Sequence, residues 1–360
     1  MTAAPVLMLC LVFAMPSCGE QADPWEDHTF EWHGEHVSVY GYGYAQADLC
    51  GGSLAELDGH TALIEDALGL AAPPYTFRWI SKEEWSARTP CRLGVFCTQG
   101  DAAMARTLPQ MHEATHALLY QAGVECPALL DEGLAMIFDG PMPRARALDL
   151  AEYEVEDLLR HFPYRGAAYD RAVHFVGFLI ERYGVRKIID LCRALPRRPT
   201  LTQWTEATSA VFEESLDELL THYTGYPRCN RQQLRARLWG CAHEDMIFQG
   251  DLRIVGGCPD AQATNRGGGA VQILRRIAFP NEALVRVTVH AEGPSGNRPW
   301  YASVACAPCS ESPLTVTQND QASGPAANLH LYDAGLHEFV VYFDSRDNVD
   351  LHIWEEPNSW

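Results

Sequence analysis

The chain has 360 residues, room for two domains of ordinary size, and its hydrophobic content of 47% is enough for compact cores. Lysine and arginine total 27 against 47 aspartates and glutamates, so the net charge is −20. This negative charge argues against nucleic acids and anionic membrane surfaces as partners. It leaves the fold and the oligomeric state undecided.

Residues 1–18 have the pattern of a signal peptide. The apolar segment from Val6 to Met15 is too short to cross a bilayer as a helix. It leads into Met-Pro-Ser-Cys, which resembles a bacterial lipobox, so we expect Cys18 to be lipidated. Plain cleavage near Ser17 and a misassigned start codon are the alternatives. We therefore expect an exported protein, either a cell-envelope lipoprotein or a secreted one, that meets the membrane only through a possible N-terminal lipid.

The first part of the folded chain alternates between strand and helix patterns. Ser53 is expected to cap a helix that Gly69 stops. Alternating apolar residues predict the strands. In chain order, the expected elements are a strand over 37–44, a helix over 53–68, a strand over 75–80, a short helix over 82–87 and a returning strand within 91–106.

The next helix carries the motif His-Glu-x-x-His. We expect Thr107 to open it with a capping box and Gly123 to stop it. His112 and His116 are four residues apart, so both imidazoles can reach one tetrahedral metal ion. Glu113 projects about 100° away from His112 around the helix, where it can act as a general base rather than as a ligand. The motif therefore predicts a zinc site.

A second helix is expected over 129–138, and it carries Glu132, 16 residues after His116. A carboxylate from a second helix completes a three-ligand site and leaves one coordination position open. The alternative is a helix whose histidines only cap or pack. Asp131 and Asp139 are both possible hydrogen-bond partners for a ligand histidine, and the sequence does not choose between them.

These motifs resemble the gluzincin branch of the peptidase MA-like zinc metallopeptidases. In that branch His-Glu-x-x-His is followed by Glu-Gly-Leu-Ala-x-x-Phe, which stands here at 132–138. A further similarity is the pattern Tyr-x-x-Ala-x-x-Phe-x-x-x-Leu-x-x-x-Tyr-Gly at 169–184. The resemblance covers about residues 105–225. It implies a Zn²⁺ ion held by His112, His116 and Glu132.

The resemblance also implies hydrolysis of a peptide or protein substrate. Glu113 is expected to take a proton from water and pass it to the leaving amine. In this family, a tyrosine or histidine of the helical half supplies a donor to the oxyanion, and Tyr169 is the first candidate. His174 is the second, but it stands where a small residue is more common, so that role is not carried over to it. An edge strand of the small N-terminal sheet is expected to bind the substrate backbone.

The pattern from 146 to 225 is helical, and from about Asp245 it alternates. The helical part is expected to pack around the metal and to close a cleft against the sheet. The alternating part predicts a β-sandwich, and a hairpin at 332–342 resembles those of jelly-roll modules. The expected helices are 148–160, 169–182, 185–195, 201–205, 208–212 and 216–223, and the expected strands are 271–274, 284–289, 301–304, 329–332, 338–343 and 351–354.

The cysteines fit an exported protein. Apart from Cys10 and Cys18, six precede residue 240 and four follow it. Even counts on both sides favour disulfides in an oxidising compartment, so we expect at least four bridges with none crossing residue 240.

The predicted organisation is a signal peptide at 1–18, an α+β zincin-like metallopeptidase domain at 19–240 and an all-β, jelly-roll-like sandwich at 241–360. The main alternative to an enzyme is a catalytically silent exported lipoprotein that uses both domains for binding. A third hypothesis is sugar binding by the sandwich, for which Trp300 and Trp354 are available as a platform.

Overall fold

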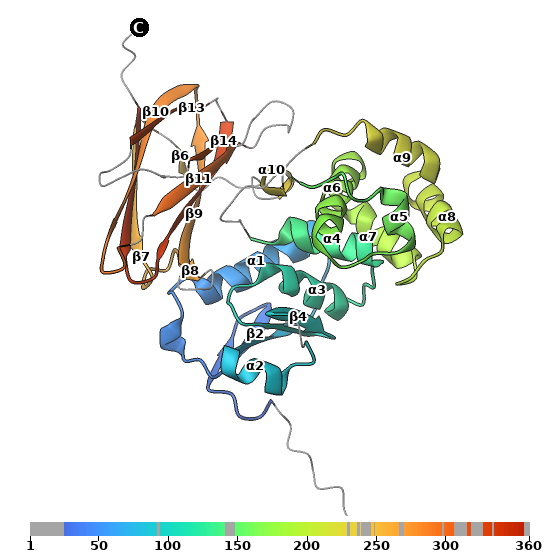
Figure 1. Ribbon diagram of the computed structural model, residues 1–360, viewed down its shortest axis with the longest axis horizontal. Helices are drawn as coiled ribbons and strands as arrows, with labels where there is room; N and C mark the ends of the chain where they lie inside the picture. The colour runs from blue at the N-terminus through green and yellow to red at the C-terminus, as the bar shows by residue number, and fades with distance from the viewer. Residues whose placement is uncertain are drawn as a thin grey trace, which may run out of the picture.

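The computed structural model shows a mixed α/β protein in which a helix-rich part precedes a β-rich part (Figure 1). Among the described residues, no helix is both long and apolar enough to cross a membrane. The predicted signal segment and Cys18 lie outside these residues. The structure describes residues 25–91, 94–140, 148–228, 231–235, 238, 246–247, 249–265, 270–296, 299–305, 315–317, 327–332 and 335–355.

The N-terminal part is built on a five-stranded sheet with the order β1-β2-β3-β5-β4. Strands β2, β3 and β5 are parallel, and β4 runs antiparallel to β5 at the edge. The single strand expected within 91–106 is therefore a hairpin, because Gly100 with φ of +61° lets the chain reverse. The strands are β1 Phe30–His33, β2 Val37–Tyr42, β3 Tyr75–Ile80, β4 Phe96–Gln99 and β5 Ala102–Ala105.

Helices cover both faces of this sheet. Helices α1 and α3 contribute Leu57 and Met111 to a core that includes Ala103 of β5. Helix α2 contributes Trp85 to a separate core with Met104, whose side chain points to the opposite face of the same strand. The elements are a 3₁₀ turn at Gln46–Asp48, α1 at Ser53–Leu68, α2 at Lys82–Arg88 and α3 at Met111–Gln121.

The expected start of α3 at Thr107 is wrong. The helix begins at Met111 with Gln110 as N-cap, and no side chain caps it. The reason is local: Leu108 precedes Pro109, and a residue before proline is disfavoured in the helical region. The expected stop is confirmed, since Gly123 has a φ of +68° just after the helix.

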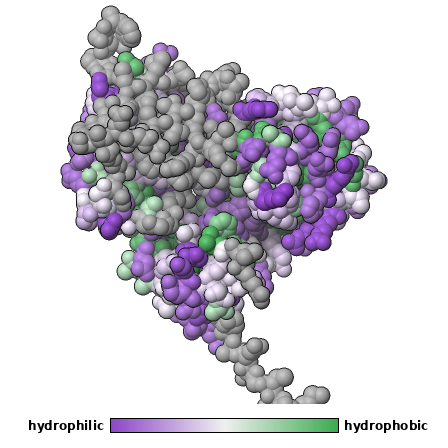
Figure 2. All heavy atoms as spheres, viewed as in Figure 1, coloured by the Kyte–Doolittle hydropathy of each residue, from purple (hydrophilic) through white to green (hydrophobic). Residues whose placement is uncertain are grey.

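The helical half forms the largest core of the molecule. Helix α4 crosses α6 closely, because Gly133 has no side chain and a Cβ there would lie 2.4 Å from Val176. The surface over α8 and its neighbours is largely hydrophilic (Figure 2), which leaves the apolar residues of these helices for the core. The helices are α4 Ala128–Phe138, α5 Val155–Arg160, α6 Gly166–Tyr183, α7 Val185–Ala194, α8 Leu201–Phe212, α9 Leu216–Thr224 and α10 Arg231–Arg235.

Three of the expected helices differ from the structure. The helix expected over 148–160 begins only at Val155. The two short helices expected over 201–205 and 208–212 are one helix, α8. The capping box of Thr200 with Gln203 starts it, and the threonines inside it bond back to carbonyls of the preceding turn.

The C-terminal part contains two sheets that share one core, with Val285 and Ile353 on one sheet and Ile273 and Val341 on the other. The expected β-rich organisation is therefore present. Sequence patterns missed β7 and the short strands β6, β8 and β12. One sheet has the order β13-β10-β15-β7, and the other has the order β12-β11-β14-β9-β6, with β8 also paired to β9. The strands are β6 Met246–Ile247, β7 Asp251–Gly257, β8 Ala263–Asn265, β9 Ala270–Phe279, β10 Ala283–Glu292, β11 Trp300–Ala305, β12 Thr315–Thr317, β13 Ala327–Tyr332, β14 Gly335–Asp344 and β15 Asn348–Glu355.

The prediction that no disulfide crosses residue 240 is wrong, because Cys50 is bonded to Cys258. The expectation that Ser53 caps α1 is wrong, because Gly52 is the N-cap and no side chain caps the helix. The start of α1 docks on the C-terminal part. The Gly51 N–H donates to the Cys258 carbonyl at 2.8 Å, and the Ser53 hydroxyl donates to Asn265 Oδ1 at 2.7 Å. Counting cysteines on each side of a boundary cannot reveal a pairing that exists only in the folded chain. The other two disulfides join Cys91 to Cys97 and Cys126 to Cys192.

Disulfides in the described residues indicate an oxidising, extracytoplasmic environment. The expected minimum of four bridges stays a prediction, since four candidate cysteines lie outside the described residues: Cys229, Cys241, Cys306 and Cys309. The domain boundary near residue 240 also stays a prediction. The sugar platform is not tested either: Trp354 is partly buried beside His352, with their rings 4.5 Å apart, and the Trp300 side chain is outside the described set.

Candidate metal centre

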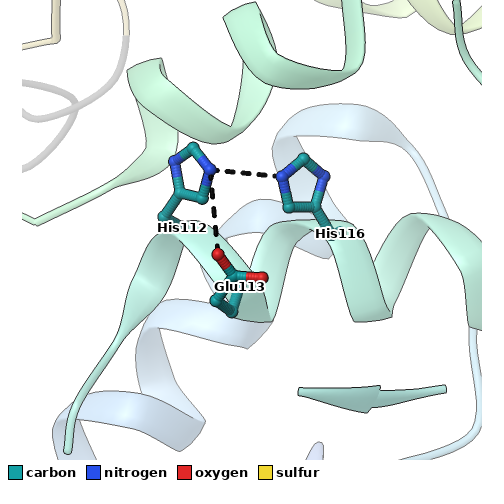
Figure 3. A group of neighbouring side chains, drawn as sticks. All are labelled: His112, Glu113 and His116. Atoms are coloured by element: carbon teal, nitrogen blue, oxygen red, sulfur yellow. Dashed lines mark hydrogen bonds and ion pairs between the residues drawn. The ribbon is translucent and has the colours of Figure 1, made fainter. Parts of the chain in front are cut away.

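Helices α3 and α4 bring three donor atoms together. The imidazoles of His112 and His116 project from the same side of α3 with Glu113 beside them (Figure 3). Their Nε2 atoms are 3.2 Å apart. Glu132 Oε2 on α4 lies 3.2 Å from Nε2 of His112 and 3.5 Å from Nε2 of His116. The three atoms therefore form a nearly equilateral triangle.

The triangle has the dimensions of one face of a zinc tetrahedron. Zinc bonds of about 2.0–2.1 Å to nitrogen and oxygen put two ligand atoms roughly 3.3–3.4 Å apart at the tetrahedral angle. Glu132 is 8% exposed, and its Oε2 atom is buried without a hydrogen-bond partner of good geometry. An unsatisfied buried carboxylate oxygen is costly, and a cation among the three atoms removes that cost. Two imidazole nitrogens and a carboxylate oxygen are also donors that zinc accepts, so the residues fit the ion.

The charges around the triangle hold its carboxylate ionised. Burial alone would raise the pKa of Glu132, but the neighbouring imidazoles of His112 and His116 lower that pKa to about 2. Burial opposes a charge on His116 as well, yet the carboxylates of Asp131 and Glu132 raise its pKa above the ordinary value. Because a metal ligand must be a neutral histidine or a charged carboxylate, a cation at this position displaces the proton that His116 otherwise attracts.

Glu113 stands next to the triangle but outside it. It is 5% exposed, and its Oε1 atom lies 3.9 Å from His112 Nε2. The Thr98 hydroxyl, on the edge strand β4, donates to Glu113 Oε2 at 2.7 Å and also lies 3.2 Å from the Glu113 backbone carbonyl. Thr98 therefore fixes the orientation of this carboxylate. Sequence reasoning missed Thr98, because the contact depends on how the hairpin packs on α3.

The structure distinguishes between Asp131 and Asp139, the two candidate partners for a ligand histidine. Asp131 Oδ1 lies 3.1 Å from His116 Nδ1, on the side of the ring away from the triangle. Asp139 instead accepts from the Gly140 N–H at 2.9 Å, just past the end of α4. The Asp131 carboxylate is thus the one that orients His116.

Tyr169 and His174 both lie on α6 but in different surroundings. The Tyr169 ring is 6.5 Å from the His112 ring, and partial burial together with the Glu132 and Glu113 carboxylates raises the pKa of its phenol. His174 is buried away from the centre, with its ring nitrogens 2.8 Å from the Tyr223 hydroxyl and 2.9 Å from the Pro227 carbonyl. The structure therefore brings Tyr169 to the centre and does not bring His174 there.

Further aromatic side chains flank the centre, and the sequence analysis did not single them out. Phe96 on β4 is 41% exposed, with its ring 6.3 Å from that of His112. On the helical side, Phe162 packs against both Tyr169 and Tyr164, at 5.6 Å and 5.2 Å between ring centroids. Tyr164 is 57% exposed and has a φ of +50°, a backbone conformation that is unfavourable for a tyrosine and is often found at functional sites.

The outer edge of β4 has backbone groups available beside Glu113. The Arg106 N–H donates to the Val95 carbonyl, so in the antiparallel register Cys97 and Gln99 also bond to β5. By alternation, the backbone N–H and C=O groups of Phe96 and Thr98 point to the other side. Within the described residues, no strand pairs with that edge.

The comparisons with known proteins do not supply a family. No family model matches the chain, and no curated protein matches it. Among the solved structures that match is the pre-peptidase C-terminal domain of collagenase from Bacillus anthracis, which is 12% identical. That match covers 31% of this chain and 96% of the other with a TM-score of 0.21, which is too low to support an argument about fold or function.

Proposed function

We propose that this protein is a zinc-dependent peptide hydrolase of the gluzincin type. The observation that supports it most directly is the donor triangle of His112, His116 and Glu132, whose edges of 3.2, 3.2 and 3.5 Å suit one zinc ion. Its position between α3 and α4, in front of a small sheet with a free edge strand, agrees with a zincin-like fold for this part of the chain.

The three residues would hold the ion through two neutral imidazoles and one carboxylate. When bound, zinc would polarise the scissile carbonyl and increase the acidity of the attacking water. Asp131, 3.1 Å from His116 Nδ1, would keep that ring in the tautomer whose Nε2 is free to bind a cation.

Glu113 would act as the general base and then as the general acid. Its carboxylate is buried beside the triangle and held by the Thr98 hydroxyl, so it needs little rearrangement before it accepts a proton. The same group would then pass the proton to the leaving amine. General-base catalysis of this kind typically contributes about 10²–10⁴ in rate.

An extended peptide or protein segment would bind along β4. The backbone groups of Phe96 and Thr98 are available for two or more strand-like hydrogen bonds, and Thr98 also contacts Glu113. A substrate held there lies alongside the proton acceptor. The Tyr169 phenol, with a raised pKa and therefore protonated at neutral pH, would donate to the oxyanion from the other side.

The location that fits this function is outside the cytoplasm. Disulfides among the described residues require an oxidising compartment, and lipidation of Cys18 would attach the protein to the cell envelope. Without the lipid, the same protein would be secreted.

The test compares Glu113→Gln with Glu132→Gln in the full chain, with unfolded casein as the substrate. Glu113→Gln should retain zinc and lose about 10²–10⁴ in hydrolysis rate, because glutamine cannot accept the proton. Glu132→Gln should lose zinc as well as rate, because it removes a charged ligand. Zinc content and rate are measured in the same buffer. Hydrolysis at the wild-type rate by Glu113→Gln, or no cleavage by the zinc-loaded wild type, would favour the catalytically silent binding scaffold.

A further inference from the structure

A second polar site lies where the two parts of the chain meet. Helix α1 lies next to β8, and α10 lies beside β11 (Figure 1). Between α1 and the six-stranded sheet is a cavity of about 620 Å³, a size typical of small-molecule sites. The described residues that line it are all outside the metal centre.

One wall of the cavity is a face of α1, and the other is the outer face of the six-stranded sheet. On β9, Val271, Ile273 and Ile277 point into the sandwich core, so Gln272 and Arg276 point outward. On α1, the lining residues recur at the helical spacing. They are Gly52, Ala55, Glu56, Gly59, His60 and Leu63.

Two buried polar side chains on the sheet wall lack hydrogen bonds. Gln272 is 1% exposed, and neither its Oε1 nor its Nε2 atom has a partner. Thr264 on β8 is 5% exposed, and its hydroxyl also has none. Leaving such atoms unsatisfied is costly, and nearly all buried polar groups in native proteins are paired. Both side chains line a cavity, so a bound molecule can supply the missing partners.

The charges around the cavity favour an anionic group. Among the described lining residues are three arginines, Arg235, Arg275 and Arg276, and one carboxylate, that of Glu56. Arg235 forms a buried ion pair with Glu338, and Arg276 Nε lies 4.0 Å from the same carboxylate. Each guanidinium group has five N–H donors, so an arginine that already has a partner can bind a further carboxylate. Guanidinium groups are well shaped to bind a carboxylate with two parallel hydrogen bonds.

The other side chains that line the cavity indicate which class of ligand would fit. The side-chain amide of Gln272 is chemically a peptide group that offers both a donor and an acceptor. The only ring among the described lining residues is the imidazole of His60, so the wall lacks a broad aromatic surface for stacking a nucleobase. We propose that this junction cavity binds a short peptide, with its terminal carboxylate at the arginines and its amides paired to Gln272 and Thr264.

The experiment measures binding of tri-alanine to the full chain by calorimetry. All variants are made in a Glu113→Gln background, so that the probe is not cut. Gln272→Leu removes the unsatisfied amide and should weaken binding at least about tenfold, the loss expected for one buried hydrogen-bonding group. Gln46→Leu makes the same chemical change on the exposed surface and should leave binding unchanged.

A second variant fills the cavity without removing a polar group. A Cβ at Gly59 would meet no atom within 4 Å, so Gly59→Leu should block the cavity. The substitution should also stabilise the helix, because glycine is a poor helix former. Loss of tri-alanine binding with an undiminished melting temperature is the expected result. Tri-alanine amide, which lacks the carboxylate, should bind at least about tenfold more weakly to the unblocked chain.

The outcomes separate this site from the metal centre. Tri-alanine binding that persists in the zinc-free His112→Ala chain, and disappears with Gly59→Leu, supports the junction cavity whether or not the protein is a peptidase. The proposal is overturned if the folded wild-type chain gives no binding, or if Gln272→Leu and Gly59→Leu both bind as tightly as Gln46→Leu. It is also overturned if binding is lost with His112→Ala, because the peptide then occupies the metal centre.

Discussion

The metal centre and the junction cavity both contain buried polar atoms without hydrogen bonds, but the space around those atoms differs. Glu132 Oε2 has two imidazole nitrogens within 3.5 Å, which leaves room for a single ion. The Gln272 amide lines a cavity of about 620 Å³, which has room for a small molecule. At both sites the spacing of the neighbouring groups sets the size of ligand that could satisfy the buried atoms.

The two sites should respond independently, so a change at one should leave the other unaffected. His112→Ala or His116→Ala should reduce bound zinc from about one ion per chain to background, since losing one of three strong ligands weakens affinity by orders of magnitude. Elemental analysis after dialysis measures this. Tri-alanine binding at the cavity should be unchanged. Stoichiometric zinc in both variants would remove the metal assignment.

A smaller effect is expected where a residue serves the metal centre without binding the ion. Tyr169→Phe should keep zinc and lower kcat by about 10²–10³, the usual cost of one oxyanion donor. The exposed Tyr164→Phe is the matched control, because its ring contacts Phe162 rather than His112. Casein hydrolysis at saturating substrate gives kcat for both variants. If Tyr164→Phe is the slower enzyme, the oxyanion donor is Tyr164 and the assignment of Tyr169 is wrong.

Loss of the disulfide between Cys50 and Cys258 should affect the junction cavity more than the metal centre. Replacing both Cys50 and Cys258 with serine should lower the free energy of unfolding by about 2–4 kcal/mol, because the bridge closes a long loop in the unfolded chain. Urea unfolding measures this loss, and tri-alanine affinity should fall with it while zinc content stays constant. Replacing both Cys91 and Cys97 with serine is the control. Their bridge closes a loop of sequence separation only 6, so its loss should lower the free energy of unfolding by less. Equal losses for the two pairs would mean that the long bridge does not restrain the junction.

His174 differs from both sites, because it is a buried polar side chain with partners for both ring nitrogens. Burial lowers its pKa to about 4, below the usual 6.5. Between these pH values the unfolded chain binds a proton that the folded chain does not, so the free energy of unfolding falls as the pH drops from 6.5 to 4. The fall attributable to His174 is about 3 kcal/mol and levels off below pH 4.

His174→Gln keeps hydrogen-bonding capacity but cannot titrate, so its stability should depend less on pH over the same window. Urea unfolding of zinc-free protein at several pH values measures the difference between the two chains, in which contributions from other groups cancel. If the free energy of unfolding depends on pH in the same way in wild type and variant, the His174 ring is not held neutral by burial. Zinc binding at neutral pH should be the same in both, since this side chain lies away from the centre.

Features that depend on neighbours along the chain could be predicted from the sequence. His112 and His116 share one side of α3 because residues four apart on a helix always do, and Gly69 ends α1 because only glycine adopts its left-handed conformation without cost. The β-rich C-terminal part was also predictable, because alternation of apolar residues is a local property. The start of α3 was missed although its cause is local, since the proline rule outweighs a capping pattern there.

Contacts between distant segments could not be predicted, because they form only in the folded chain. The choice of Asp131 over Asp139 beside His116, the Thr98 hydroxyl on Glu113, and the position of His174 away from the centre all depend on how elements pack. The bond between Cys50 and Cys258 spans a sequence separation of 208, and the junction cavity exists only because α1 docks on the outer face of a sheet. Periodicity and spacing describe one element at a time, whereas these contacts are set by the free energy of burying several elements together.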